Sequence, residues 1–245
     1  MSAIAVAAFT WKSINQVNNE QAITREGQIT DRYNAAVGNL GNKASEDVRL
    51  GGIYALQRIM QDSPRDQPTV MNVLASFIRV HSEKPKPKSG ETAVTSDVAA
   101  AAKVLLFRDT HNDGGGSGIS KLRGDEDFDR YLRNRQRSVD LQGADLHDLS
   151  LEYAQLGKAD LNGADLSGAS LITADLHEAY LIGADLKDAD LSGASLRNAT
   201  LQSADLSNAS LKSADFTCAV LFNTNLQNAF PERDHPRADL VYCGH

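Results

Sequence analysis

The chain has 245 residues, of which 41% are hydrophobic and 6% aromatic, and its formal net charge is −7. This length allows two domains, and the hydrophobic fraction is normal for a soluble protein. Residues 139–229 hold thirteen acidic and four basic side chains, a balance that disfavours direct nucleic-acid binding, which needs clustered Lys and Arg.

A short apolar run opens the chain. Ser2–Trp11 carries no charged residue and is too short to span a bilayer by itself. No basic segment precedes it, so the pattern disfavours a secretory signal. One interpretation is a helix face packed against its own domain, and the alternative is contact with a membrane or a partner helix.

Helix-forming segments with apolar residues at three- and four-residue steps follow. Ser45 is a suitable N-cap for the second segment, which covers residues 45–63. Pro68 is suited to the first turn of the third segment, which covers residues 68–82. The second and third resemble one helical hairpin of the HEAT-like kind. The four predicted helices cover residues 13–41, 45–63, 68–82 and 95–107.

Two spacers interrupt the helical part. Residues 84–88 read KPKPK, which favours an extended proline-rich spacer. Residues 109–138 are rich in glycine at first and end in FDRYLRNRQRS, which predicts a lead-in helix that covers the first coil of the following repeats.

From Leu141 to Leu226 every fifth residue is Leu, with Phe216 the one substitution, and the residue two before it is almost always Ala. A period of five fits neither an amphipathic helix nor an alternating strand, and it indicates a stacked repeat. These residues resemble the pentapeptide-repeat family. The resemblance implies a right-handed quadrilateral β-helix with four pentapeptides per coil, about 4.5 coils here.

The segments VRLGGIYALQRI and SDVAAAAKVL also resemble the region before the repeats in actinobacterial-type pentapeptide proteins, which often carry membrane-spanning helices upstream. The predicted fold is therefore mixed, an all-α module followed by a β-helix solenoid whose local Leu and Ala core should fold independently. The predicted domains are a helical module at 1–108, a linker and cap at 109–138, the repeats at 139–229 and a tail at 230–245.

No arrangement in the sequence predicts a catalytic site, a cofactor or a metal. The six histidines show no paired spacing, and His147 and His177 are expected to point to solvent. Asp175, His177 and Ser195 share a face, but a convex rod provides no oxyanion hole or cleft for a triad. Cys218 and Cys243 are interpreted as reduced thiols, with one bridge as the alternative.

Two surface patterns emerge at twenty-residue steps. The first is an acidic ladder, interpreted either as an interaction surface or as aspartates that hydrogen-bond the backbone in turns. The second is an apolar patch, a candidate docking surface. The acidic ladder consists of Asp145, Asp165, Asp185 and Asp205, and the apolar patch of Tyr180, Ile182, Val220 and Phe222.

The sequence as a whole predicts a non-enzymatic adaptor or scaffold that presents the repeats to another protein. It predicts a cytoplasmic location, with membrane association through Ser2–Trp11 as an alternative. The rival function is a DNA-mimicking modulator of a topoisomerase, which resemblance to quinolone-resistance relatives implies. A short rod and a tail without a dimerisation helix favour the adaptor.

Overall fold

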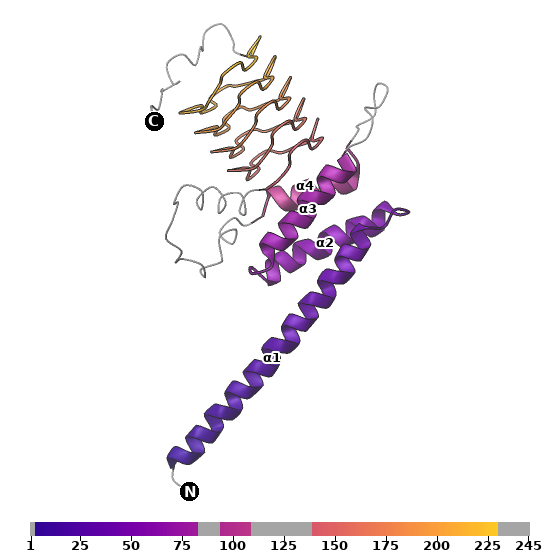
Figure 1. Ribbon diagram of the computed structural model, residues 1–245, viewed down its shortest axis with the longest axis vertical. Coiled ribbons are helices and arrows are strands. Elements are labelled where there is room, and N and C mark those ends of the chain that lie inside the picture. The colour runs from indigo at the N-terminus through magenta and orange to yellow at the C-terminus, as the bar shows by residue number, and fades with distance from the viewer. Residues whose placement is uncertain (1–2, 83–93, 109–138, 230–245) are drawn as a thin grey trace, which may run out of the picture. The chain divides into compact units, whose positions relative to one another are not determined.

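The computed structural model describes residues 3–82, 94–108 and 139–229 (Figure 1). The predicted spacer, lead-in helix and C-terminal tail lie outside these residues. The chain divides into two compact units, Met1–Ser63 and Pro64–His245. This division separates the two helices that the sequence pairs as a HEAT-like hairpin, so that hairpin stays a prediction.

Two helices make up the first unit, α1 (Ala3–Leu40) and α2 (Glu46–Asp62). The predicted long helix is confirmed, and the apolar opening run forms its first turns. Ser45 caps α2 as predicted, since its side chain accepts a hydrogen bond from the Val48 N–H. In the described part of the chain, no helix is long and apolar enough to cross a membrane.

The packing of α1 on α2 depends on a glycine. A Cβ atom at Gly52 would lie 2.7 Å from the carbonyl oxygen of Ala36, so only glycine permits this approach. Ala36 and Leu40 are buried, whereas Val17 and Ile23 are 50% and 71% exposed. Val37 is also exposed, at 36%, so α1 buries only a few side chains near its C-terminal end.

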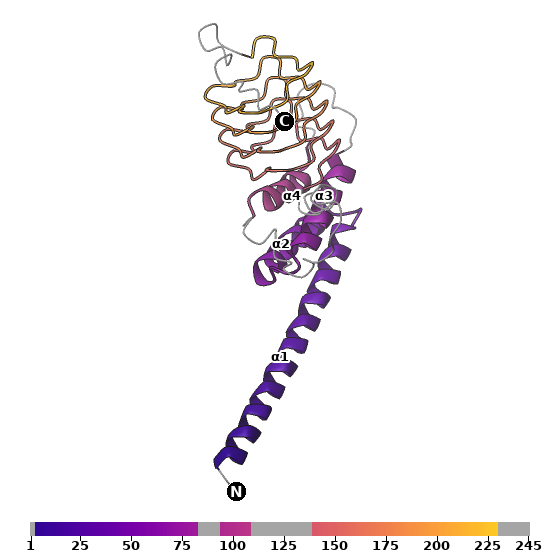
Figure 2. The same ribbon diagram turned by 60° about the vertical axis from the view of Figure 1, so that its left-hand side comes forward.

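The second unit contains α3 (Gln67–Ser82), α4 (Ser96–Leu106) and the repeats. Both helices occupy the segments that the sequence predicts. Most of their apolar side chains are buried, with Leu74, Ile78 and Leu105 at 0% exposure, whereas Val80 is 65% exposed. The two helices pack on each other (Figure 2).

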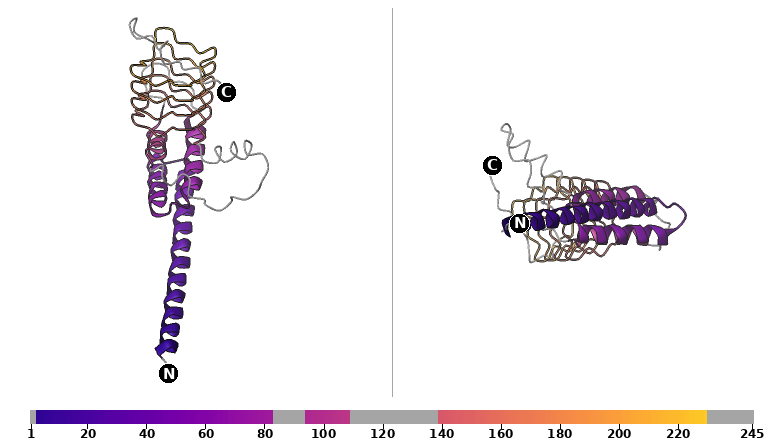
Figure 3. Two further views of the ribbon diagram at one scale, coloured as in Figure 1. Left: turned by 90° about the vertical axis from the view of Figure 1, so that its left-hand side faces the viewer. Right: turned by 90° about the horizontal axis from the view of Figure 1, so that it is seen from below.

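The repeats stack as successive coils joined by isolated parallel bridges between residues twenty apart, such as Asp160 with Tyr180 (Figure 3). No longer strand forms within residues 139–229. The backbone bonds repeat with the same register, since Asp160 N–H donates to the Val139 carbonyl and Leu161 N–H donates to the Tyr180 carbonyl. Central leucines from Leu141 to Leu206 are at most 2% exposed and form the predicted apolar column.

A β-turn separates the sides of each coil, and every fifth residue from Gly143 to Asn228 has a positive φ. Ala144 N–H closes the first turn by donating to the Leu141 carbonyl at 3.1 Å. Glycine occupies several of these positions without strain, but Thr173 has a φ of 54°, which is costly for a β-branched residue.

The last turn of α3 and the end of α4 contact the first coil. Within the stack a ladder N–H donates to a carbonyl twenty-one residues earlier, and the first coil has no preceding coil to accept. Asp145 N–H donates to the Ser82 hydroxyl, and Gln155 N–H donates to the Leu106 carbonyl. These two helices thus satisfy donors that an open end would expose.

Candidate functional site

The acidic ladder exists as a column in the structure. Parallel bridges join its members in order, and Asn225 continues the column after Asp205. All four aspartates are partly buried. Stacked strands lie about 4.8 Å apart, so these carboxylates are close neighbours of like charge.

Each ladder carboxylate also accepts a hydrogen bond from the backbone two residues later. Asp185 accepts from the Lys187 N–H at 3.0 Å, and Asp205 accepts from the Ser207 N–H at 2.9 Å. Aspartates of other columns do the same, for example Asp190 with the Ser192 N–H. This geometry matches the turn-forming interpretation, so the repeat itself explains why Asp is common at this position.

Two of these turn aspartates have shifted acidities. Hydrogen bonds from the Ser207 side chain and N–H lower the pKa of Asp205, and Thr217 lowers the pKa of Asp215 in the same way. In both cases the bonds to the charged form outweigh desolvation. The ionised carboxylate is therefore the form that the folded repeats favour.

The apolar patch lies on two neighbouring columns. Tyr180 and Val220 are separated by Thr200 in one column, and Ile182 and Phe222 lie two residues further along the same coils. All four side chains are exposed, from 39% for Tyr180 to 63% for Phe222. The patch is thus two apolar pairs with a polar row between them.

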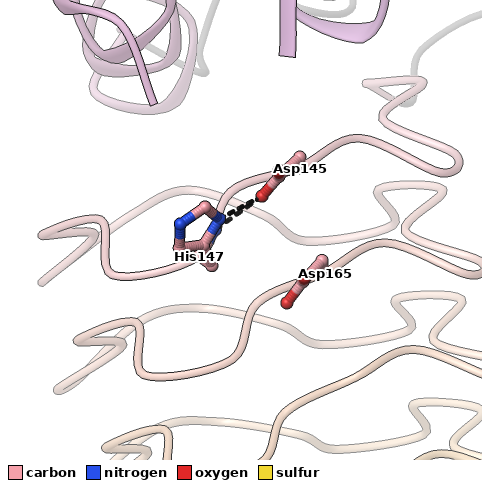
Figure 4. Close-up of side chains that lie close together, drawn as sticks. All are labelled: Asp145, His147 and Asp165. Atoms are coloured by element: carbon pink, nitrogen blue, oxygen red, sulfur yellow. Dashed lines mark hydrogen bonds and ion pairs between the residues drawn. The ribbon is translucent and has the colours of Figure 1, made fainter. Parts of the chain in front are cut away.

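The expectation that His147 points to solvent is wrong. Its side chain is only 16% exposed, and its Nδ1 contacts the Asp145 carboxylate (Figure 4). Asp165, one coil later, completes a group whose ligand atoms all lie within 4.8 Å of one another. We call this group the Asp–His trio. Combining a two-residue step with a twenty-residue step along the sequence would have found it.

A second Asp–His pair repeats this local geometry one and a half coils later. His177 Nδ1 lies 2.7 Å from Asp175 Oδ1, and the side chains are 41% and 37% exposed. The His177 ring lies against Gly157, one coil earlier, because a Cβ there would be 2.2 Å from the ring. Ser195 pairs with Asp175 from the following coil, so the imidazole and this hydroxyl lie on opposite sides of Asp175. A triad is not assembled.

Sequence reasoning also missed the contacts that dock α3 on the first coil. Arg79 forms an ion pair with Asp140, and the buried Ser82 receives the Asp145 N–H. Both lie in the last turn of α3, where the sequence shows only an apolar stripe ending in polar residues. The sequence does not show that Asp140 and Asp145 are their partners, because these contacts form only in the three-dimensional structure.

The interpretation of Cys218 as a reduced thiol is wrong, because Cys218 is disulfide-bonded in the structure. Cys243, the other cysteine, lies outside the described residues.

The pentapeptide repeats profile matches the chain in eight copies over residues 140–177, 174–212 and 189–228. None of the curated proteins matches the chain. Among solved structures, the pentapeptide repeat protein Rfr23 from the cyanobacterium Cyanothece 51142 is 41% identical with a TM-score of 0.32. That match covers 37% of this chain and 58% of the cyanobacterial chain.

The pentapeptide repeat protein alr5209 from Nostoc PCC 7120 is 32% identical over 46% of this chain and 91% of its own, with a TM-score of 0.26. QnrB1, a plasmid-mediated fluoroquinolone resistance protein, is 23% identical over 36% of this chain and 50% of its own, with a TM-score of 0.21. Residues 140–228 of the chain therefore belong to the pentapeptide-repeat family. The family implies a right-handed β-helix, and its members are generally non-enzymatic structural or interaction proteins.

Proposed function

We propose that this chain is a non-enzymatic adaptor that binds another protein through the apolar patch on its repeats. The observation that carries this proposal is the exposure of four large apolar side chains at outward positions that polar residues fill on most coils. Burying such a group on binding removes apolar surface from water, which stabilises the complex by about 25 cal/mol per Å² of apolar surface buried. The proposal gives the chain no direct contact with nucleic acid.

The test compares binding partners recovered by the full chain and by the double variant Tyr180→Ser, Ile182→Ser. Tyr153→Ser is the matched control, since Tyr153 is 64% exposed and lies outside the patch. The partner captured by the wild-type chain should be lost with the double variant and kept with the control. Retention by both variants would exclude the patch as the binding surface.

The rival function is DNA mimicry towards a topoisomerase, and the continuous column of the acidic ladder is the observation that favours it. A mimic needs charge, so inhibition of gyrase supercoiling should fall steeply with salt. Replacing all four ladder aspartates by Asn should then abolish it, while the turn hydrogen bonds survive, as Asn225 keeps its own with Gln227. We expect no inhibition by the wild-type chain, and strong salt-sensitive inhibition would favour the rival.

A second contact is proposed for Ser2–Trp11, with a membrane surface or a partner helix. The described side chains of α1 nearest to this stretch, Gln16 to Asn18, are exposed and so are accessible to a partner. Flotation with liposomes, comparing the full chain with one lacking residues 2–11, separates the two. Flotation of the full chain alone indicates a membrane. Flotation of neither leaves a partner helix or packing within the chain's own domain, and only internal packing predicts a lower thermal unfolding midpoint on deletion.

A further inference from the structure

Two stacked carboxylates and an imidazole meet in the Asp–His trio, near the start of the repeats (Figure 4). We propose that the trio binds one divalent transition-metal cation, with Zn²⁺ as the ion that its donors suit best. The site would clip two successive coils together beside the contact between Ser82 and Asp145. This goes beyond the proposed adaptor function and does not depend on it.

The donor set argues for the class of ion. Zn²⁺ is bound in proteins by histidine nitrogen and carboxylate oxygen at about 2.0–2.2 Å, commonly in tetrahedral geometry. The three ligand atoms lie within 4.8 Å of one another, close enough to share one such ion. Ca²⁺ and Mg²⁺ prefer oxygen ligands alone, so the imidazole discriminates against them.

The fold pre-organises these ligands. A parallel bridge joins Asp145 to Asp165, which fixes their spacing at one coil. Asp145 also accepts from the His147 N–H at 3.4 Å, and Asp165 accepts from the Ser167 N–H at 3.0 Å. The ligands therefore lose little freedom on binding, and a cation would offset the repulsion between two half-buried carboxylates.

The chain contains its own comparison for this site. Asp175 and His177 repeat the Asp-Leu-His segment, but Ser195 takes the place that Asp165 has in the trio. Among the described residues, the trio is the one group of three or more potential ligands that converge in this way. Other ladder pairs such as Asp185 and Asp205 stack equally but lack an imidazole, so stacked carboxylates alone do not make the site.

The experiment measures Zn²⁺ binding to the full chain by calorimetry after EDTA treatment and dialysis. Asp165→Ser copies the natural arrangement at Ser195, and His147→Gln removes the nitrogen ligand. Each should weaken the tightest binding event at least tenfold. Asp185→Ser, in the same acidic ladder, and His177→Gln, in the second Asp–His pair, are the matched controls. Each should change the affinity of the tightest binding event less than twofold.

A second readout does not depend on calorimetry. Excess Zn²⁺ should raise the thermal unfolding midpoint of the wild-type chain through preferential binding to the folded state, and Ca²⁺ should not. Circular dichroism without metal checks that each variant folds. If Asp165→Ser does not fold, the Zn²⁺ affinity of His147→Gln tests the proposal. Zn²⁺ binding that is equal in all variants, or no Zn²⁺ binding at all, would overturn the proposal, as would tighter binding of Ca²⁺.

Discussion

At the residue scale, two demands shape each pentapeptide. The central residue fills a closed apolar column, and the second residue after it must adopt a left-handed backbone conformation. Asn, Ser, Asp and Gly recur at the second position because they tolerate that conformation or form local hydrogen bonds. The aspartate before the central residue supports the same turn.

Thr173 meets the second demand only with backbone strain, and removing that strain should stabilise the repeats. We expect Thr173→Asn to raise the free energy of unfolding by about 1 kcal/mol, because a β-branched residue is strained at positive φ and Asn is not. Asn198 and Asn208 already occupy the equivalent place. Thr200→Asn, at a bridge position, is the control and should give no gain in the thermal midpoint.

The central column should tolerate no charge. Leu186 is completely buried, so Leu186→Asp would place a carboxylate among apolar side chains at a cost of several kcal/mol, enough to unfold the repeats. Asp188→Asn, two residues away on the surface, should be neutral or slightly stabilising since Asp188 has a φ of 57°. Urea denaturation followed by circular dichroism measures the stability of both variants. Equal stability of the two would contradict the claim that the central column tolerates no charge.

At the scale of elements, α3 and α4 act as the cap of the first coil. The sequence predicts a lead-in helix at 128–138 for this role, and that segment lies outside the described residues. The observed contacts of Ser82 and Leu106 replace acceptors of a missing coil. They argue against complete independence of the repeats from the helices.

Removing one cap acceptor should weaken the unit. Ser82→Ala leaves the Asp145 N–H without the hydroxyl it donates to, in a place where Ser82 is 5% exposed, and should cost about 1–2 kcal/mol. The Asp145 amide should also exchange its hydrogen faster. Ser192→Ala removes an exposed hydroxyl pair with Ser210 and should be nearly neutral, so equal effects of both changes would refute the capping role.

At the scale of the whole molecule, acidic turns make stability depend on pH. The pKa values of Asp205 and Asp215 are lower in the folded chain than in the unfolded chain, where Asp titrates near about 3.9. Their stabilising effect is therefore complete above the unfolded value and is lost as pH falls through the folded values. A third carboxylate, Asp62, shifts in the same direction because Arg32 donates to it.

We expect the thermal midpoint to stay level between about pH 7 and pH 5 and to fall below about pH 4. The double variant Asp205→Asn, Asp215→Asn should lose less stability over the acidic range, because Asn keeps the turn bond without titrating. Parallel pH profiles for the two proteins would show that other groups govern acid unfolding.

The sequence by itself determined the repeat, its family and the places of the four helices. Leu at every fifth residue and Ser45 before an amphipathic segment are local signals, and local interactions decide those features. The sequence also predicts the columns of the acidic ladder and the apolar patch, because residues twenty positions apart become neighbours on successive coils.

The tertiary structure alone decided what lies beside the first coil and how side chains turn on the surface. Nothing in the sequence pairs Ser82 with Asp145, because residues 83–138 separate α3 from the repeats and the contact spans sixty-three positions. The half-buried state of His147 likewise depends on its neighbours in space, whereas the equivalent His177 stays more exposed. A periodic sequence specifies the repeating core, but the ends of the stack and the orientation of its side chains depend on non-periodic contacts.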